Sequence, residues 1–223
     1  MSNLNESGLN PAAQGKAAVM KQIPDDAAVR AESPLHHIDL PSMAGKQKDG
    51  GIYLKELAFV GHLSLRCDQK NAEQLSTVKE ILGLELPLQP LTSNTNDQVQ
   101  IRWMSPDEWL ITVPGDRTFE IEGLFREKMT GHYSLVNGSG GQTILEVRGP
   151  SVVDLLKKCV PVDLHSSEFP GGKVVSTTFA KAGAVIRRLD EQSFELVIRR
   201  SFADYIWLWI QDASQEFGLV IEQ

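Results

Sequence analysis

Few residues in this sequence are of a type and spacing that could carry chemistry. The only paired histidines are His36 and His37, and adjacent side chains point apart on a helix or a strand, so the pair does not make a bidentate metal site. Cysteine occurs twice, at Cys67 and Cys159, without a CxxC pair, which excludes a disulfide scaffold and a four-cysteine zinc or iron–sulfur site. Cys159 ends an apolar helix face, and we interpret it as a core thiol rather than a nucleophile.

The one glycine-rich stretch, residues 138–141, lacks the features of a ligand-binding loop. It joins two predicted strands, has no Gly-Lys-Ser/Thr ending and begins no helix that could hold a phosphate. We interpret it as a turn at the seam between two halves of the chain. His62, His132 and His165 are isolated and are interpreted as surface or turn histidines. We therefore predict no catalytic, cofactor-binding or metal-ligating residue on this chain.

Composition narrows the class of protein further. The chain has 223 residues, and its 22 lysines and arginines against 29 acidic residues leave a net charge of −7. This net charge argues against nucleic acid or an anionic membrane as a partner, because the protein and the phosphate groups would repel each other overall. No run of about 18 apolar residues is present, so we expect no membrane span and a soluble, cytoplasmic protein.

The elements that would position any site begin only after residue 50. All 15 aromatic residues (4 Trp, 3 Tyr and 8 Phe) lie at or after Tyr53. We predict that residues 1–50 form a mostly disordered tail, since they cannot bury enough apolar surface to offset the entropy of ordering them. Residues 33–38 are more apolar and contain Pro34, so docking of this stretch is the alternative.

Residues 51–140 are predicted to form a first half with the order β-α-β-β-α-β. Asn71 is a good N-cap and Gly83 a good C-terminal stop for its first helix. The predicted strands cover residues 58–66, 98–104, 108–113 and 132–137, and the helices cover residues 71–82 and 118–130. This order is the split βαβ unit.

Residues 141–223 are predicted to repeat that order loosely. The expected strands cover residues 142–148, 173–180, 184–189 and 194–200, with a closing strand at 219–221. A helix follows Gly149-Pro150, and the longest helix covers residues 201–217, with Ser201 as its cap and Asp204 completing a capping box. The fold class is therefore α+β, with two tandem ferredoxin-like halves.

The last helix is apolar over too wide an arc for an ordinary surface helix. Helical spacing predicts that its core face comprises Phe202, Ile206, Trp209, Ile210, Ala213 and Phe217. Tyr205, Trp207 and Leu208 then fall outside that stripe, to be covered either by a second layer of this fold or by a partner protein.

Three further residues are candidates for the same partner surface. Trp103 and Trp109 flank a Ser-Pro-Asp-Glu turn and belong either to the core or to this surface. Arg200 is one of four arginines on two predicted neighbouring strands. It is either an ordinary surface residue or a contact to an acidic partner.

Several ordered motifs together resemble the gamma subunit family of heterotetrameric sarcosine oxidase. The resemblance covers roughly residues 33–220 and is closest from Trp103 to Trp207. The motifs are Ser33-Pro34-Leu35, Trp103-Met-Ser-Pro-Asp-Glu-Trp-Leu110, Val147-Arg-Gly-Pro150 with Leu155-Leu156, Cys159-Val-Pro-Val-Asp-Leu-His165 with Phe169 and Gly171, Thr177-Thr-Phe-Ala-Lys-Ala182, and Arg199-Arg-Ser-Phe-Ala-Asp-Tyr-Ile-Trp207. The segment at Asn137-Gly138-Ser139 departs from the family pattern.

The resemblance implies a noncatalytic subunit of an oxidoreductase complex. That complex demethylates sarcosine to glycine with oxygen, giving hydrogen peroxide and either formaldehyde or methylenetetrahydrofolate. It implies that FAD, FMN, NAD and tetrahydrofolate are held by other subunits and none by this chain. It also implies alpha, beta and delta subunits as partners, with this chain packing on the alpha subunit in a fold like that of the glycine cleavage T-protein.

Two alternatives of the same fold remain. One is a free-standing folate-binding or aminomethyltransferase-like protein, although this chain lacks room for the third domain of a full T-protein. The other is a folate-dependent iron–sulfur maintenance protein, whose characteristic Lys-Gly-Cys-Tyr motif is missing here. Both predict that the isolated chain binds tetrahydrofolate.

Overall fold

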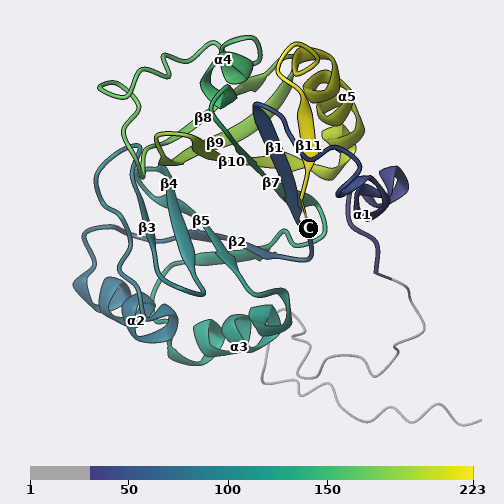
Figure 1. The fold of residues 1–223 in the computed structure, drawn as a ribbon. Coiled ribbons are helices and arrows are strands. Elements are labelled where there is room, and N and C mark those ends of the chain that lie inside the picture. The colour runs from purple at the N-terminus through teal and green to yellow at the C-terminus, as the bar shows by residue number, and fades with distance from the viewer. Residues whose placement is uncertain (1–30, 223) are drawn as a thin grey trace, which may run out of the picture. The chain divides into compact units, whose positions relative to one another are not determined.

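The computed structural model describes residues 31–222, and their mixed α+β architecture confirms the predicted fold class (Figure 1). The first half forms a five-stranded sheet in the order β3-β4-β5-β2-β6. Its elements are β2 (Gly61–Arg66), α2 (Ala72–Leu82), β3 (Ser93–Thr95), β4 (Gln100–Ser105), β5 (Glu108–Val113), the 3-10 turn η3 (Gly115–Arg117), α3 (Thr118–Lys128) and β6 (Ser134–Asn137). Without the short β3, the order β4-β5-β2-β6 is that of a ferredoxin-like unit.

Local sequence explains why α2 forms where it does. The Asn71 side chain accepts hydrogen bonds from the backbone N–H groups of Glu73 and Gln74, as its capping position predicts. Gly83 ends the helix with a φ of 65°, which a residue without Cβ adopts at no steric cost. Between these ends, α2 buries Val78 and Leu82 against the sheet.

The second half forms a six-stranded sheet in the order β11-β1-β7-β10-β9-β8. Its elements are β1 (Ile52–Leu57), β7 (Gln142–Arg148), α4 (Val152–Lys157), β8 (Val174–Phe179), β9 (Ala182–Asp190), β10 (Ser193–Arg199), η4 (Arg200–Phe202), α5 (Ala203–Ala213) and β11 (Leu219–Ile221). Helix α5 is shorter than predicted, and neither Ser201 nor Asp204 caps it, because the 3-10 turn η4 precedes it. No helix of the described residues is both long and apolar enough to cross a bilayer.

Strand β1 crosses the predicted boundary between the halves. It belongs by sequence to residues 51–140, but it pairs with β7 on one side and β11 on the other. It therefore takes the place beside β7 that the last strand of a ferredoxin-like unit would occupy. The predicted strand at 58–66 is correspondingly shorter, because Phe59 turns the chain with a φ of 59° before β2 begins. The division into domains at residue 140 stays a prediction.

A segment that we call the strap, residues 32–43, is ordered rather than part of a tail. It contains η2 (His36–Ile38) and α1 (Leu40–Met43). Leu35 and Leu40 are 1% and 6% exposed and join the core of the six-stranded sheet. The strap therefore follows the alternative given for residues 33–38, docking, and not the tail: Leu35 and Leu40 anchor it in the core, and Ser33 and His37 contact Glu56 and Asp204. The part of that prediction that concerns residues 1–30 lies outside the described residues.

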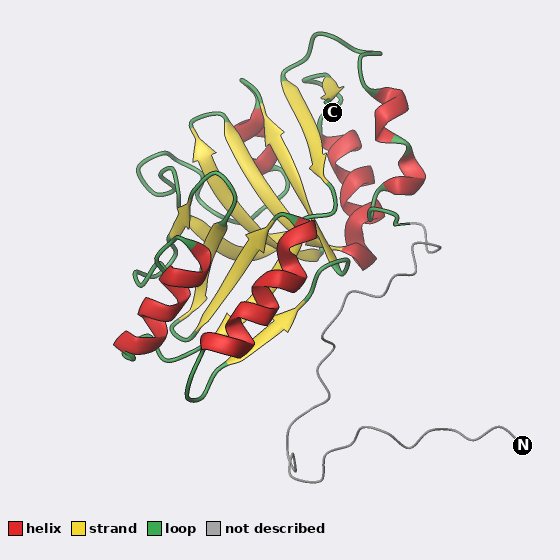
Figure 2. Cartoon of the chain, turned by 90° about the horizontal axis from the view of Figure 1, so that it is seen from below, coloured by secondary structure: helices red, strands yellow, loops and turns green. Residues whose placement is uncertain are grey.

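The two sheets face each other and carry their helices on the outside. Figure 1 shows α2 and α3 on one side of the sheets and α4 and α5 on the other; Figure 2 shows the same layers from below. Leu110, Ile144 and Val197 form an apolar cluster between the sheets. Each sheet also has a larger core beneath its own helices.

An ion cluster of Arg102, Arg187 and Glu195 also lies between the sheets. Arg102 Nη2 lies 2.7 Å and Arg187 Nη1 3.2 Å from Glu195 Oε2, and all three side chains are at most 7% exposed. Arg102 also donates to Thr112 Oγ1 at 3.0 Å and to Gln100 Oε1 at 2.5 Å. Two buried guanidinium groups share one carboxylate. The loss of any member of the cluster would therefore leave a charge buried without its partner.

Candidate partner interface

Neither thiol is a candidate nucleophile. Cys67 and Cys159 are 5% and 4% exposed, and burial raises the pKa of each to about 11. The Cys159 thiol lies 3.1 Å from the Leu155 carbonyl oxygen, which confirms its predicted place in the core. Both thiols are therefore protonated near neutral pH and lack the nucleophilic thiolate form.

The histidines do not converge on a common site. His37 Nε2 lies 2.9 Å from Asp204 Oδ1, whereas His36 Nε2 lies 3.5 Å from Glu32 Oε1. His62 is buried, which corrects its interpretation as a surface or turn residue. Burial and, to a smaller extent, the Arg102 charge lower its pKa to about 4, against the opposing effect of the contact with the Val60 carbonyl oxygen. Within residues 31–222, no three His, Cys, Asp or Glu side chains are placed to hold a metal ion.

Helix α5 buries a face that partly overlaps the predicted one: Ile206 and Ile210 are buried as predicted, whereas Phe202 and Trp209 are exposed. Ala203, Ile206, Trp207 and Ile210 lie on the core side, in an i, i+3, i+4, i+7 pattern. Trp207, a predicted interface residue, is 3% exposed and belongs to the core. Trp209, a predicted core residue, is 38% exposed instead. The apolar arc is so wide that helical spacing alone favours neither face, and only the docking of Ala203 and Trp207 on the sheet decides between them.

The outward face of α5 carries a contiguous apolar surface, which we call the α5 strip. It consists of Phe202, Tyr205, Leu208 and Trp209, spaced to lie on one side of the helix. Leu208 is 55% and Phe202 40% exposed, and the Tyr205 and Trp209 rings lie 6.1 Å apart between centroids. Large apolar side chains grouped in this way mark a protein–protein contact more often than a bare surface. Tyr205 and Leu208 were predicted here; Phe202 and Trp209 were missed.

The remaining interface candidates divide between core and surface. Trp109 is fully buried and its indole N–H donates to the Pro87 carbonyl at 2.8 Å, so its place is in the core and not at a surface of this chain. Trp103 is half-buried against the same core. Arg200 is exposed, but its guanidinium donates to the carbonyl oxygens of Gly140 and Glu32 at 2.6 and 2.7 Å. Arg200 therefore fastens the strap and the glycine-rich turn to the start of α5.

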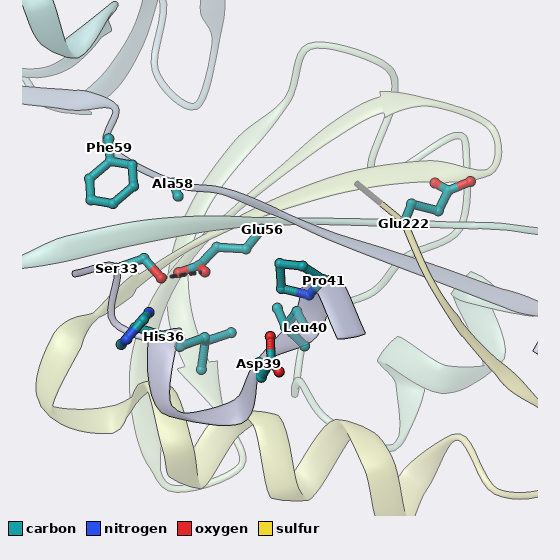
Figure 3. A pocket seen from close by; sticks show the side chains of 10 residues that line it. Ser33, His36, Asp39, Leu40, Pro41, Glu56, Ala58, Phe59 and Glu222 are labelled. Atoms are coloured by element: carbon teal, nitrogen blue, oxygen red, sulfur yellow. Dashed lines mark hydrogen bonds between the residues drawn. The ribbon is translucent and has the colours of Figure 1, made fainter. Parts of the chain in front are cut away.

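A pocket of about 480 Å³ lies beside the strap (Figure 3). Leu40 and Ala58 are among its apolar lining residues, and the Phe59 ring stands at one end of it. Glu56, Asp39 and Glu222 contribute carboxylates. The strap that forms one wall is tied to α5 through the His37–Asp204 and Arg200–Glu32 contacts, so the pocket adjoins the same region as the N-terminal end of α5. No sequence pattern indicates this pocket, because its lining residues come from three distant segments of the chain.

Comparison with known proteins gives one consistent result. The model of the sarcosine oxidase, gamma subunit family matches residues 66–216. A sarcosine oxidase subunit gamma of Corynebacterium sp. (strain P-1) is 27% identical over 187 residues, which covers 83% of this chain and 91% of that relative. The same subunit from an Arthrobacter species is 28% identical over 191 residues, again covering 83% of this chain and 91% of the relative.

Solved structures show the same likeness. A chain of the heterotetrameric sarcosine oxidase from Corynebacterium sp. U-96 superposes with a TM-score of 0.75 at 25% identity, covering 84% of this chain and 96% of that one. The glycine cleavage system aminomethyltransferase T from Bartonella henselae superposes with a TM-score of 0.59 at 12% identity, covering 85% of this chain and 59% of that one. The second likeness is one of fold alone.

Proposed function

Because the chain belongs to the sarcosine oxidase gamma subunit family, we propose that it is a noncatalytic subunit of a heterotetrameric complex that oxidises sarcosine to glycine. The observation that carries this proposal is the family match over residues 66–216, together with relatives that align over nine-tenths of their own length. The relatives that match are themselves gamma subunits, and the alignment spans 91% of the length of each.

The chemistry of the described side chains supports a noncatalytic role. Burial keeps both thiols protonated and His62 neutral near pH 7. The carboxylate of Glu195 already binds two guanidinium groups inside the protein. We propose that FAD, FMN, NAD and tetrahydrofolate are held by the alpha and beta subunits, that this chain packs on the alpha subunit, and that a delta subunit completes the complex in the cytoplasm.

The α5 strip supports assembly as the role of this chain. Its side chains would gain roughly 25 cal/mol for each Å² of apolar surface that a partner covers. Aromatic side chains are the type that protein interfaces concentrate at their centre. We propose that Tyr205, Leu208, Phe202 and Trp209 contact the alpha subunit, with Arg200 beside them; Trp103, which packs on the core of the other sheet, would belong to a separate contact.

Co-expression with the other subunits tests this function. We expect a charge placed on the α5 strip by Leu208→Glu to reduce recovery of the complex at least tenfold while leaving the isolated chain folded. Val136→Glu is the matched control, because Val136 is 58% exposed and Leu208 55% exposed, and it should leave recovery unchanged.

Two results would contradict the proposal. One is equal recovery with Leu208→Glu and Val136→Glu, which would remove the α5 strip from the interface. The other is a wild-type chain that never joins a complex and binds tetrahydrofolate by itself in calorimetry. That outcome would favour a free-standing folate-binding or aminomethyltransferase-like protein.

A further inference from the structure

The strap pocket has charge that the described protein leaves uncompensated. The two oxygens of Glu56 accept hydrogen bonds from Ser33 Oγ at 2.8 Å and Thr143 Oγ1 at 2.9 Å, and the Asp39 carboxylate binds Ser42 Oγ. Among residues 31–222, neither carboxylate forms an ion pair, whereas Glu222 is paired with Arg148. Among the described residues that line the pocket, none is a lysine or arginine, and the one histidine, His36, lies 3.5 Å from Glu32 Oε1. A half-enclosed space with two unpaired carboxylates attracts a cation.

The rest of the lining suits a long aliphatic chain rather than a hydrated ion. Leu35 and Leu40 are buried in the core at the base of the strap, and Pro41 and Ala58 complete the apolar wall. A lysine or arginine side chain can lay its methylene groups on such a surface and present its charge at the end. Glu56 lies in the middle of the pocket in Figure 3, within reach of a group that enters along this wall.

Phe59 adds an exposed ring at the pocket's end. It is 60% exposed, although a phenylalanine at this position would be expected to bury its ring. An exposed aromatic ring next to carboxylates is a favourable place for a cationic group.

We propose that this pocket receives a lysine or arginine side chain from a neighbouring subunit of the complex. This inference rests on the proposed function and adds the chemistry of the partner to it. The cation pairs with Glu56, its aliphatic stem contacts Leu40 and Pro41, and Phe59 covers it from one end. The contact supplements the α5 strip, to which the strap is tied by His37 and Arg200.

A competition experiment in the assembled complex tests the pocket. A tagged variant and the untagged wild-type chain are co-expressed with the other subunits, and intact-mass spectrometry gives the ratio of the two chains within the complex. Glu56→Gln keeps a hydrogen-bond acceptor and removes the charge. Phe59→Asn keeps a residue that tolerates positive φ and removes the ring. Glu127→Gln, on the exposed surface of α3, is the control.

We expect the control to be incorporated as often as wild type, Glu56→Gln at most one tenth as often, and Phe59→Asn severalfold less often. Equal incorporation of all three variants would overturn the inference and leave the proposed function standing. A wild-type chain that joins no complex would instead contradict the proposed function itself. Binding of N-acetyl-lysine methylamide by the free chain, lost in Glu56→Gln while incorporation is unchanged, would show a small-molecule amine site and also overturn the inference.

Discussion

The ion cluster between the sheets makes the sharpest stability prediction. Glu195 is the single carboxylate that Arg102 and Arg187 share, and Gln100 Nε2 donates to its other oxygen at 3.1 Å. Replacement by glutamine keeps the size of the side chain but turns part of it into an amide NH2 group. Two buried guanidinium groups would then lose their shared counter-charge, in a layer where water cannot replace it.

The expected cost follows from the burial of the partners. Removing one member of a buried ion pair costs about 3–5 kcal/mol, because the remaining charge stays buried and unpaired. The free energy of unfolding of a whole domain is only about 5–15 kcal/mol. Glu195→Gln should therefore remove a large part of this stability. Arg102 is fully buried and Arg187 is 7% exposed, so neither can turn to solvent without opening the sheets.

Urea unfolding followed by tryptophan fluorescence measures this cost, since Trp109 is buried in the core of the same sheet as Arg102. Asp107→Asn removes the exposed partner of Arg66 and serves as the control, with almost no change in the midpoint expected. A triple variant with Arg102→Met, Arg187→Leu and Glu195→Leu should recover most of the loss. If Glu195→Gln shifts the midpoint no more than the control does, the reasoning about buried charge is refuted.

Three further changes test other parts of the structure. His62 has a pKa of about 4 in the folded chain and 6.5 when free, so the unfolded chain takes up a proton first as the pH falls. The free energy of unfolding should therefore decrease between pH 6.5 and 4, by about 3 kcal/mol in all. Urea unfolding at pH 7 and pH 5 should show this decrease in wild type and a smaller one in His62→Gln. Leu35→Ala should cost about 2–5 kcal/mol in the same assay, and a cost near zero would mean that the strap is not part of the fold. Cys67 and Cys159 should react with a thiol reagent at pH 8 only on the timescale of unfolding; fast labelling of the native chain would contradict their burial.

The first half of the chain was the most predictable part. Its first helix has local start and stop signals in Asn71 and Gly83, and the strand predicted at residues 98–104 alternates polar and apolar residues. Local signals of this kind determine the β-α-β-β-α-β order, and the sheet order then follows from the few ways such a unit can close. The second half was predicted less exactly, because the neighbour of β7 is a strand from a distant part of the sequence.

The errors in the site have related physical causes. Trp109 and Trp207 are large apolar residues whose spacing is compatible with core and surface alike, and tertiary packing decides between the two. The ion cluster was missed because Arg102 looks like any polar residue in an alternating strand. Only the second sheet, which brings Glu195 and Arg187 over it, makes Arg102 a buried residue. The strap was predicted to be part of a tail because two leucines, Leu35 and Leu40, are too few to form the repeating apolar pattern that indicates a helix.

Native mass spectrometry of material purified through a tag on this chain tests the central claim most directly. The proposal predicts a single complex that contains one copy of this 24.6 kDa chain and three other subunits and that oxidises sarcosine. It also predicts that Leu208→Glu shifts the tagged material from the complex to the free chain. Recovery of the wild-type chain alone, at its own mass, from cells that make all the other subunits would contradict the account.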